Sequence, residues 1–152
     1  PNMPLAVVYD GVAGCENCSQ PIIDALKGKY RVLKAGTKEK VSIKDALAMN
    51  PKIYIQPGGG DNMDIAWNDL KGSAEYIRNY VANGGSYVGI CMGAYLAGVF
   101  DLNNNKQGGL NLLDESGSYA DAYPETKNAE VKDSKSHLID LKWNGKDIKI
   151  YY

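Results

Sequence analysis

Cys91 stands between two glycines in the stretch Gly89-Ile90-Cys91-Met92-Gly93, after an apolar run and before small helix-forming residues. The Gly-x-Cys-x-Gly spacing matches the Gly-x-Ser-x-Gly turn of a nucleophile elbow, with sulfur in place of oxygen. In such a turn the nucleophile has a strained backbone, and the flanking glycines relieve the crowding. A helix N-terminus would also favour the thiolate. Cys91 is therefore the candidate nucleophile, and a cysteine used only for packing is the alternative.

A glycine-rich stretch, residues 57–61 with the sequence PGGGD, follows a second apolar run. Consecutive glycines leave backbone N–H groups free of side-chain interference, so together with the Met92 N–H they predict an oxyanion hole. A flexible turn after a strand is the alternative. Tyr95, just after the elbow, and Asp61 are the candidate pocket residues.

Cys15-Glu16-Asn17-Cys18 forms a C-x-x-C motif before a predicted helix. This spacing fits a redox pair or a structural disulfide, and a link between Cys18 and Cys91 is a further alternative. Two cysteines are too few for a four-ligand zinc site, because the other ligands would have to come from elsewhere in the chain. We therefore expect no metal and no cofactor.

Short apolar runs alternate with helical patterns along the first two thirds of the chain. The predicted strands are 5–9, 30–33, 52–56 and 86–90; the predicted helices follow N-caps at Ser19 and Ser42 and span 71–83. Gly28 and Gly84 are placed to end the first and third helices. This order predicts an α/β fold with a mostly parallel sheet and right-handed crossovers. The loops after the first, third and fourth strands should then meet at the carboxyl edge of the sheet.

The last third of the sequence is more polar. Residues 103–109 and 116–135 read as long surface connections. Asn144-Gly145 separates the alternating segments 137–143 and 146–152, and this is a strong β-hairpin signal.

The length, net charge and apolar runs of the chain limit the classes of function that it can have. A chain of 152 residues predicts one domain, residues 1–152, and a net charge of -1 gives no electrostatic reason to expect nucleic acid as a partner. No run approaches the roughly 18 apolar residues of a membrane span, so we expect a soluble protein without a membrane partner. The first residue is Pro1 rather than Met, and the chain stops inside a predicted strand. We therefore expect that the natural protein can extend beyond either end of this sequence. The sequence fits both a cytoplasmic protein and an exported one. It also fits a homo-oligomer.

The stretches YIQPGGGD and VANGGSYVGICMGAYLAG, with VVYDG before them and WNGKDIKIYY after them, resemble the class I glutamine amidotransferase-like superfamily. Within it the chain most resembles the domain at the N-terminus of some biotin-protein ligases, which also occurs as a stand-alone protein. The resemblance implies a flavodoxin-like three-layer sandwich. It also implies Cys91 at the nucleophile position and Gly59, Gly60 and Met92 at the oxyanion hole.

Active members of that superfamily pair the cysteine with a His-x-Glu arrangement, which this chain lacks. A catalytic thiol needs a base to take its proton and an acid to orient the base. His137, the one histidine, is the candidate base if the hairpin folds back over the strand ends; a strand-edge histidine is the alternative. Another branch takes a glutamate from the loop after the first strand, which makes Glu16 the candidate acid neighbour. A solvated loop carboxylate is the alternative for Glu16.

Three function hypotheses follow. We favour a non-catalytic domain that binds a small-molecule ligand or has a regulatory role, because the triad is incomplete. A thiol-dependent hydrolase or amidotransferase using Cys91 is the alternative. A redox-responsive protein using Cys15, Cys18 and Cys91 is the third hypothesis.

Overall fold

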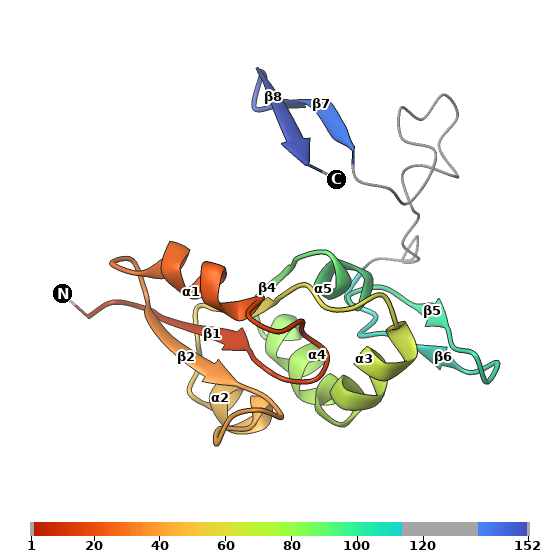
Figure 1. Ribbon diagram of the computed structural model, residues 1–152. Coiled ribbons are helices and arrows are strands. Elements are labelled where there is room, and N and C mark those ends of the chain that lie inside the picture. Colours follow the sequence, from red (N-terminus) through yellow and green to blue (C-terminus); the bar gives the residue numbers. More distant parts are fainter. Residues whose placement is uncertain (1, 114–136, 152) are drawn as a thin grey trace. The chain divides into compact units, whose positions relative to one another are not determined.

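Four parallel strands form the central sheet, and they are β1 (Leu5–Tyr9), β2 (Arg31–Ala35), β3 (Ile53–Gln56) and β4 (Ser86–Gly89) (Figure 1). The strand order is β2-β1-β3-β4. All five residues of β1 are buried, because this strand has a neighbour on each side and helices over both faces. A strand in that position reads as a continuous apolar run. The computed structural model thus confirms the predicted α/β class and the parallel sheet.

Helices cover both faces of the sheet (Figure 1). They are α1 (Ser19–Leu26), α2 (Ile43–Ala48), α3 (Met63–Leu70), α4 (Ala74–Ala82) and the single-turn α5 (Met92–Tyr95). Val7 and Tyr9 of β1 belong to a core cluster that also includes residues of α2, α3 and α4. Ala6 and Val8 are also fully buried but point to the opposite face, and α1 contacts β1 and β2. The expected three layers, helix, sheet and helix, are present.

The ends of the helices agree with the sequence in three cases and differ in one. Gly28 follows the C-cap of α1 with a φ of +79°, as predicted. The Ser42 hydroxyl accepts a hydrogen bond from the Asp45 N–H at 3.0 Å, as expected of an N-cap. Gly84 follows α4 with a φ of +92°, a left-handed conformation that favours glycine. The prediction of Ser19 as an N-cap was wrong. Ser19 is the first residue of α1, because Cys18 before it has an αR backbone and occupies the cap position without a side-chain hydrogen bond.

The segment between β3 and β4 contains one helix more than predicted. The helix α3 begins after Asn62, whose side-chain oxygen accepts from the Ile65 N–H at 3.1 Å. The predicted helix over 71–83 is interrupted at its start, where Lys71–Ser73 form a 3-10 turn and α4 begins at Ala74. Gly72 lies in that turn, and glycine is a weak helix former. This segment therefore crosses the sheet as two helices.

Two antiparallel pairs of strands complete the described structure, which covers residues 2–113 and 137–151. Within the polar connection expected after residue 102, β5 (Phe100–Asp101) and β6 (Gln107–Gly108) form a short ribbon. The other expected connection, residues 116–135, lies outside the described residues. The strands β7 (Leu138–Trp143) and β8 (Lys146–Tyr151) form the predicted hairpin. Asn144 and Gly145 have φ angles of +49° and +77°, as a two-residue turn of the mirror-image type requires.

The sheet with its helices and the hairpin are separate compact units. A single domain over 1–152 stays a prediction. Among the described residues, no helix combines the length and the apolar composition needed to cross a membrane.

Candidate functional site

The carboxyl ends of β1 and β3 lie at the point where the chain changes direction across the sheet. The crossover after β1 leads to β2 on one side, and the crossover after β3 leads to β4 on the other. Such a switch point opens a crevice between the diverging loops, and ligands of α/β proteins gather there. The Cys15 N–H donates to the Gly58 carbonyl at 3.0 Å, and the Ile90 N–H donates to the Gln56 carbonyl at 3.0 Å. The structure thus confirms that the three predicted loops meet.

Cys91 has a strained backbone, with φ +52° and ψ -114°. A non-glycine residue in this region costs on the order of 1–3 kcal/mol, so the surrounding packing must hold it in place. The residue stands two positions after the end of β4 and directly before α5, and its thiol is exposed and free. The helix after it is shorter than the turn motif suggests, because α5 has only four residues. A single turn aligns few peptide dipoles, so it contributes little of the positive end charge that a long helix would supply.

The two glycines beside Cys91 are required by close packing. A Cβ on Gly89 would lie 2.3 Å from the carbonyl oxygen of Gly93, and a Cβ on Gly93 would lie 2.0 Å from the carbonyl oxygen of Gln56. Both distances are far below van der Waals contact, and both obstacles are backbone atoms. The turn is therefore pressed against its own start and against the end of β3, which explains the Gly-x-Cys-x-Gly spacing.

The glycine loop after β3 touches the other two loops. A Cβ on Gly59 would lie 2.5 Å from the Ala13 carbonyl oxygen and 3.1 Å from Cγ of Met92, whereas a Cβ on Gly60 would meet nothing within 4 Å. Within the described ranges, the backbone N–H groups of Gly59, Gly60 and Met92 donate no hydrogen bond to the protein.

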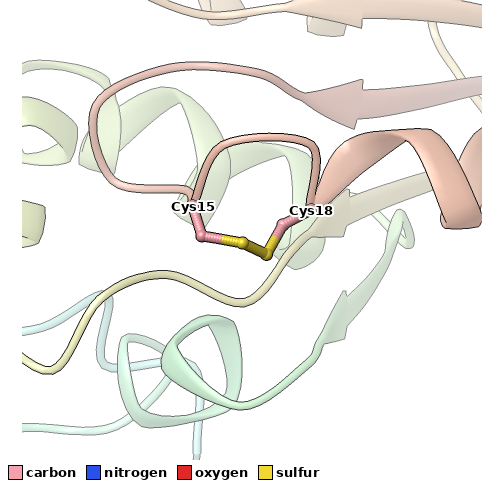
Figure 2. Close-up of a disulfide and its surroundings, with 2 residues drawn as sticks. All are labelled: Cys15 and Cys18. Atoms are coloured by element: carbon pink, nitrogen blue, oxygen red, sulfur yellow. A yellow bond between two sulfur atoms is a disulfide. The ribbon is translucent and has the colours of Figure 1, made fainter.

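Cys15 and Cys18 form a disulfide in the loop between β1 and α1 (Figure 2). The segment that follows β3 passes beside this loop, in agreement with the hydrogen bond from Cys15 to Gly58. Of the alternatives that the sequence left open, the structure therefore has the local disulfide, and Cys91 is a free thiol.

The other predicted site residues lie in different surroundings. Glu16 is exposed in the turn that the disulfide closes, and no hydrogen bond joins it to Cys91 in the described part of the chain. His137 immediately precedes β7 in the hairpin unit. Asp61 is exposed after the glycine loop, and Tyr95 is half-buried in α5. The roles proposed for these four residues stay predictions.

A buried tyrosine holds the first loop in place, and this role was not predicted from the sequence. The Tyr9 hydroxyl donates to the Asp69 carboxylate and accepts from the Ala13 N–H at 2.8 Å. Burial, and then the hydrogen bond to Asp69, raise the pKa of Tyr9 well above its usual value. The pair fixes Ala13, whose carbonyl faces Gly59. The sequence signal that would have located Asp69 is the capped helix start at Asn62, since Asp69 lies on that helix.

Gln56 at the end of β3 is a second buried polar residue beside the site. Its side chain is fully buried, and its Oε1 accepts from the Tyr54 hydroxyl at 2.5 Å. Its Nε2 has no hydrogen-bond partner among the described residues. A buried donor without a partner is costly, so this amide is a group that a water molecule or a ligand would satisfy. The Cβ of Gln56, but not its amide, is placed next to the Cys91 turn, because a Cβ on Gly93 would be 3.0 Å from it.

The sequence model described as biotin-protein ligase, N terminal, matches residues 6–107. The chain belongs to this family. The part shared with the biotin-protein ligase N-terminal family runs from β1 to the start of β6, so it holds the disulfide loop, the glycine loop and the Cys91 turn. His137 and the hairpin lie beyond it. A search of curated proteins finds no match to this member of the family.

Proposed function

We propose that this biotin-protein ligase N-terminal domain binds a small molecule at the switch point of the sheet and has a binding or regulatory role without catalysis. The ligand would present a carbonyl or carboxylate oxygen to the N–H groups of Gly59, Gly60 and Met92, next to Cys91. The observation that carries the proposal is the junction at Gly59, where three loops pack too closely for a side chain at this position. A site with so little room for movement is preorganised for binding.

The strained backbone of Cys91 supports a functional role for this turn. The packing around it holds a non-glycine residue in the left-handed region and leaves the thiol exposed. Strain of this kind persists where the surrounding structure enforces it, often at binding and catalytic sites.

The incomplete triad favours binding over catalysis. The chain has a single histidine, which lies outside the 6–107 region that defines the family, and Glu16 makes no hydrogen bond to Cys91 within residues 2–113. A thiol without a base and an orienting acid is a poor nucleophile for amide hydrolysis. The alternative of a thiol-dependent hydrolase or amidotransferase would require His137 to reach Cys91.

Protection of Cys91 from iodoacetamide tests the proposal. The family name makes biotin, which carries a carboxylate and a ureido carbonyl, the first probe, and L-glutamine the second. A ligand at about ten times its dissociation constant should occupy about nine tenths of the sites and slow alkylation about tenfold. Mass spectrometry of the peptide containing Cys91 measures the rate.

Two glycine variants serve as a matched pair. Gly59→Ala should abolish the protection, because its methyl group would collide with the Ala13 carbonyl. Gly72→Ala, whose methyl group meets nothing within 4 Å, should keep it. Unchanged alkylation with both probes would contradict the proposal. Release of ammonia from L-glutamine that is lost in Cys91→Ser would instead support the enzyme.

A further inference from the structure

All three cysteines of the chain gather around Gly58. A Cβ built on this glycine would lie 3.6 Å from Cβ of Cys91 and 3.9 Å from Sγ of Cys18. The carbonyl of the same residue accepts the hydrogen bond from the Cys15 N–H. A free thiol and a disulfide therefore both lie close to one position that holds no side chain.

We propose that Cys91 and the Cys15–Cys18 disulfide form a thiol–disulfide exchange site, independent of any ligand. The Cys91 thiol loses its proton to water, and the thiolate attacks Sγ of Cys18. The bond between Cys18 and Cys91 forms as the Cys15–Cys18 bond breaks. The electron pair of the broken bond leaves on Cys15, which takes up a proton. The chain holds one disulfide and one free thiol before and after, so no oxidant or reductant is consumed.

The positions of the sulfur atoms select Cys18 as the sulfur that is attacked. The Sγ of Cys18 and the Cβ of Cys91 are both among the three atoms nearest to a Cβ built on Gly58, and Cys91 is exposed and unpaired. Exchange rates depend on access to the attacked sulfur and on the thiolate fraction of the attacking thiol. Rotation about the Cα–Cβ bond of Cys91 between staggered rotamers changes the direction in which its sulfur points. The rate should rise with pH, because the thiolate is the nucleophile.

Exchange would change the candidate site itself. A bond between Cys18 and Cys91 would tie the loop after β1 to the turn after β4 across Gly58. Cys91 would then no longer be a free thiol, and Cys15, which is half-buried in the disulfide, would become one. The reactive thiol would thus move from the elbow position to the first loop. A reagent that reacts only with free thiols distinguishes the two forms.

Peptide mapping without reduction tests the proposal directly. Trypsin leaves Cys15 and Cys18 in one peptide, which ends at Lys27, and Cys91 in a second peptide, residues 79–106. The full chain is held at pH 8.5 for increasing times, quenched in acid and alkylated with N-ethylmaleimide. We expect label on Cys15 and a disulfide between the two peptides to increase together. Cys91→Ser should give neither signal.

The neighbouring glycines provide a matched pair of variants. Gly58→Ala adds a methyl group at ordinary contact distances from Cβ of Cys91 and Sγ of Cys18, so it should fold and hinder the approach of the two sulfur atoms. Displacing a nucleophile by about 1 Å can cost about 100-fold in rate, so we expect Gly58→Ala to slow exchange about tenfold or more. Gly60→Ala, whose methyl group has open space, should exchange as the unchanged chain does.

Each outcome bears on the proposal. Label confined to Cys91 in the unchanged chain after hours at pH 8.5, without the cross-linked peptide, would overturn the exchange site. Equal exchange rates in Gly58→Ala and Gly60→Ala would overturn the role of Gly58. Protection of Cys91 by biotin is measured separately at short times, so the exchange site can fail while the binding site stands, and the reverse.

Discussion

At the scale of single residues, the Cys91 turn depends on glycines, which have no Cβ. Gly89 and Gly93 have no room for a Cβ, because backbone oxygens occupy the space. Gly58 has room for a Cβ, which would lie at ordinary contact distances from Cβ of Cys91 and Sγ of Cys18. Glycines that are alike in the sequence therefore have different physical roles within one small region.

The packing of the turn predicts a large effect of one methyl group. Gly93→Ala should lower the free energy of unfolding by about 1–3 kcal/mol or more, since its Cβ would lie 2.0 Å from the Gln56 carbonyl oxygen. Urea unfolding followed by circular dichroism measures the change. Gly72→Ala is the control, and we expect it to leave stability unchanged or raise it by about 0.4–1 kcal/mol. Equal midpoints for the two variants would show that the turn is not tightly packed.

At the scale of the elements, local signals at helix ends explain where most helices begin and stop. Ser42 caps α2, Asn62 caps α3 and Gly84 ends α4, and each uses contacts within a few residues. The helix α1 begins differently, because the turn closed by the Cys15–Cys18 disulfide leads directly into it. The disulfide therefore directly precedes the first turn of α1.

The cap of α2 provides a prediction at this scale. Ser42→Ala should lower the free energy of unfolding by about 1 kcal/mol, because the Asp45 N–H loses its hydrogen-bond acceptor. Ser42→Asp keeps an acceptor at the same position and should restore most of the loss. Chemical denaturation of both variants measures the difference. A loss of the same size in both would mean that the hydroxyl acts in some other way.

At the scale of the whole molecule, tyrosines are buried in the core on one face of the sheet. Tyr9 and Tyr54 are fully buried, and Tyr54 packs against the ring of Tyr87 with centroids 5.8 Å apart. Burial raises the pKa of all three hydroxyl groups above their usual range. The folded chain therefore keeps phenol protons that the unfolded chain loses at high pH.

This difference predicts how stability depends on pH. The stabilisation is fully present below about pH 10, where unfolded tyrosines titrate, and it is lost as the pH rises toward the higher pKa values of the folded chain. Each buried tyrosine should lower the free energy of unfolding by about 1.4 kcal/mol between pH 9 and pH 11. Tyr54→Phe should make this fall correspondingly smaller than in the unchanged chain. Urea unfolding at pH 9, 10 and 11 measures the slopes, and identical slopes for Tyr54→Phe and the unchanged chain would contradict this prediction.

Much of the fold could be predicted from the sequence, because its signals are local. Buried strands read as apolar runs, Ser42 is a cap, and Asn144-Gly145 is a hairpin turn, and each depends on near neighbours. The helix α3 was missed although Asn62 and Asp64 signal its start. The position of the candidate site was also predictable, since strand order alone brings the loops to one edge.

The sequence by itself determined the α/β class, the hairpin and the edge of the sheet where the site lies, because periodicity and turn chemistry act over a few residues. Only the tertiary structure decided which cysteines are paired, how Tyr9 and Asp69 hold the first loop, and that Gly58 lies close to both Cys91 and Cys18. These features depend on contacts between residues far apart in the chain. Their distances are set by how the crossovers pack on the sheet, which no local pattern records.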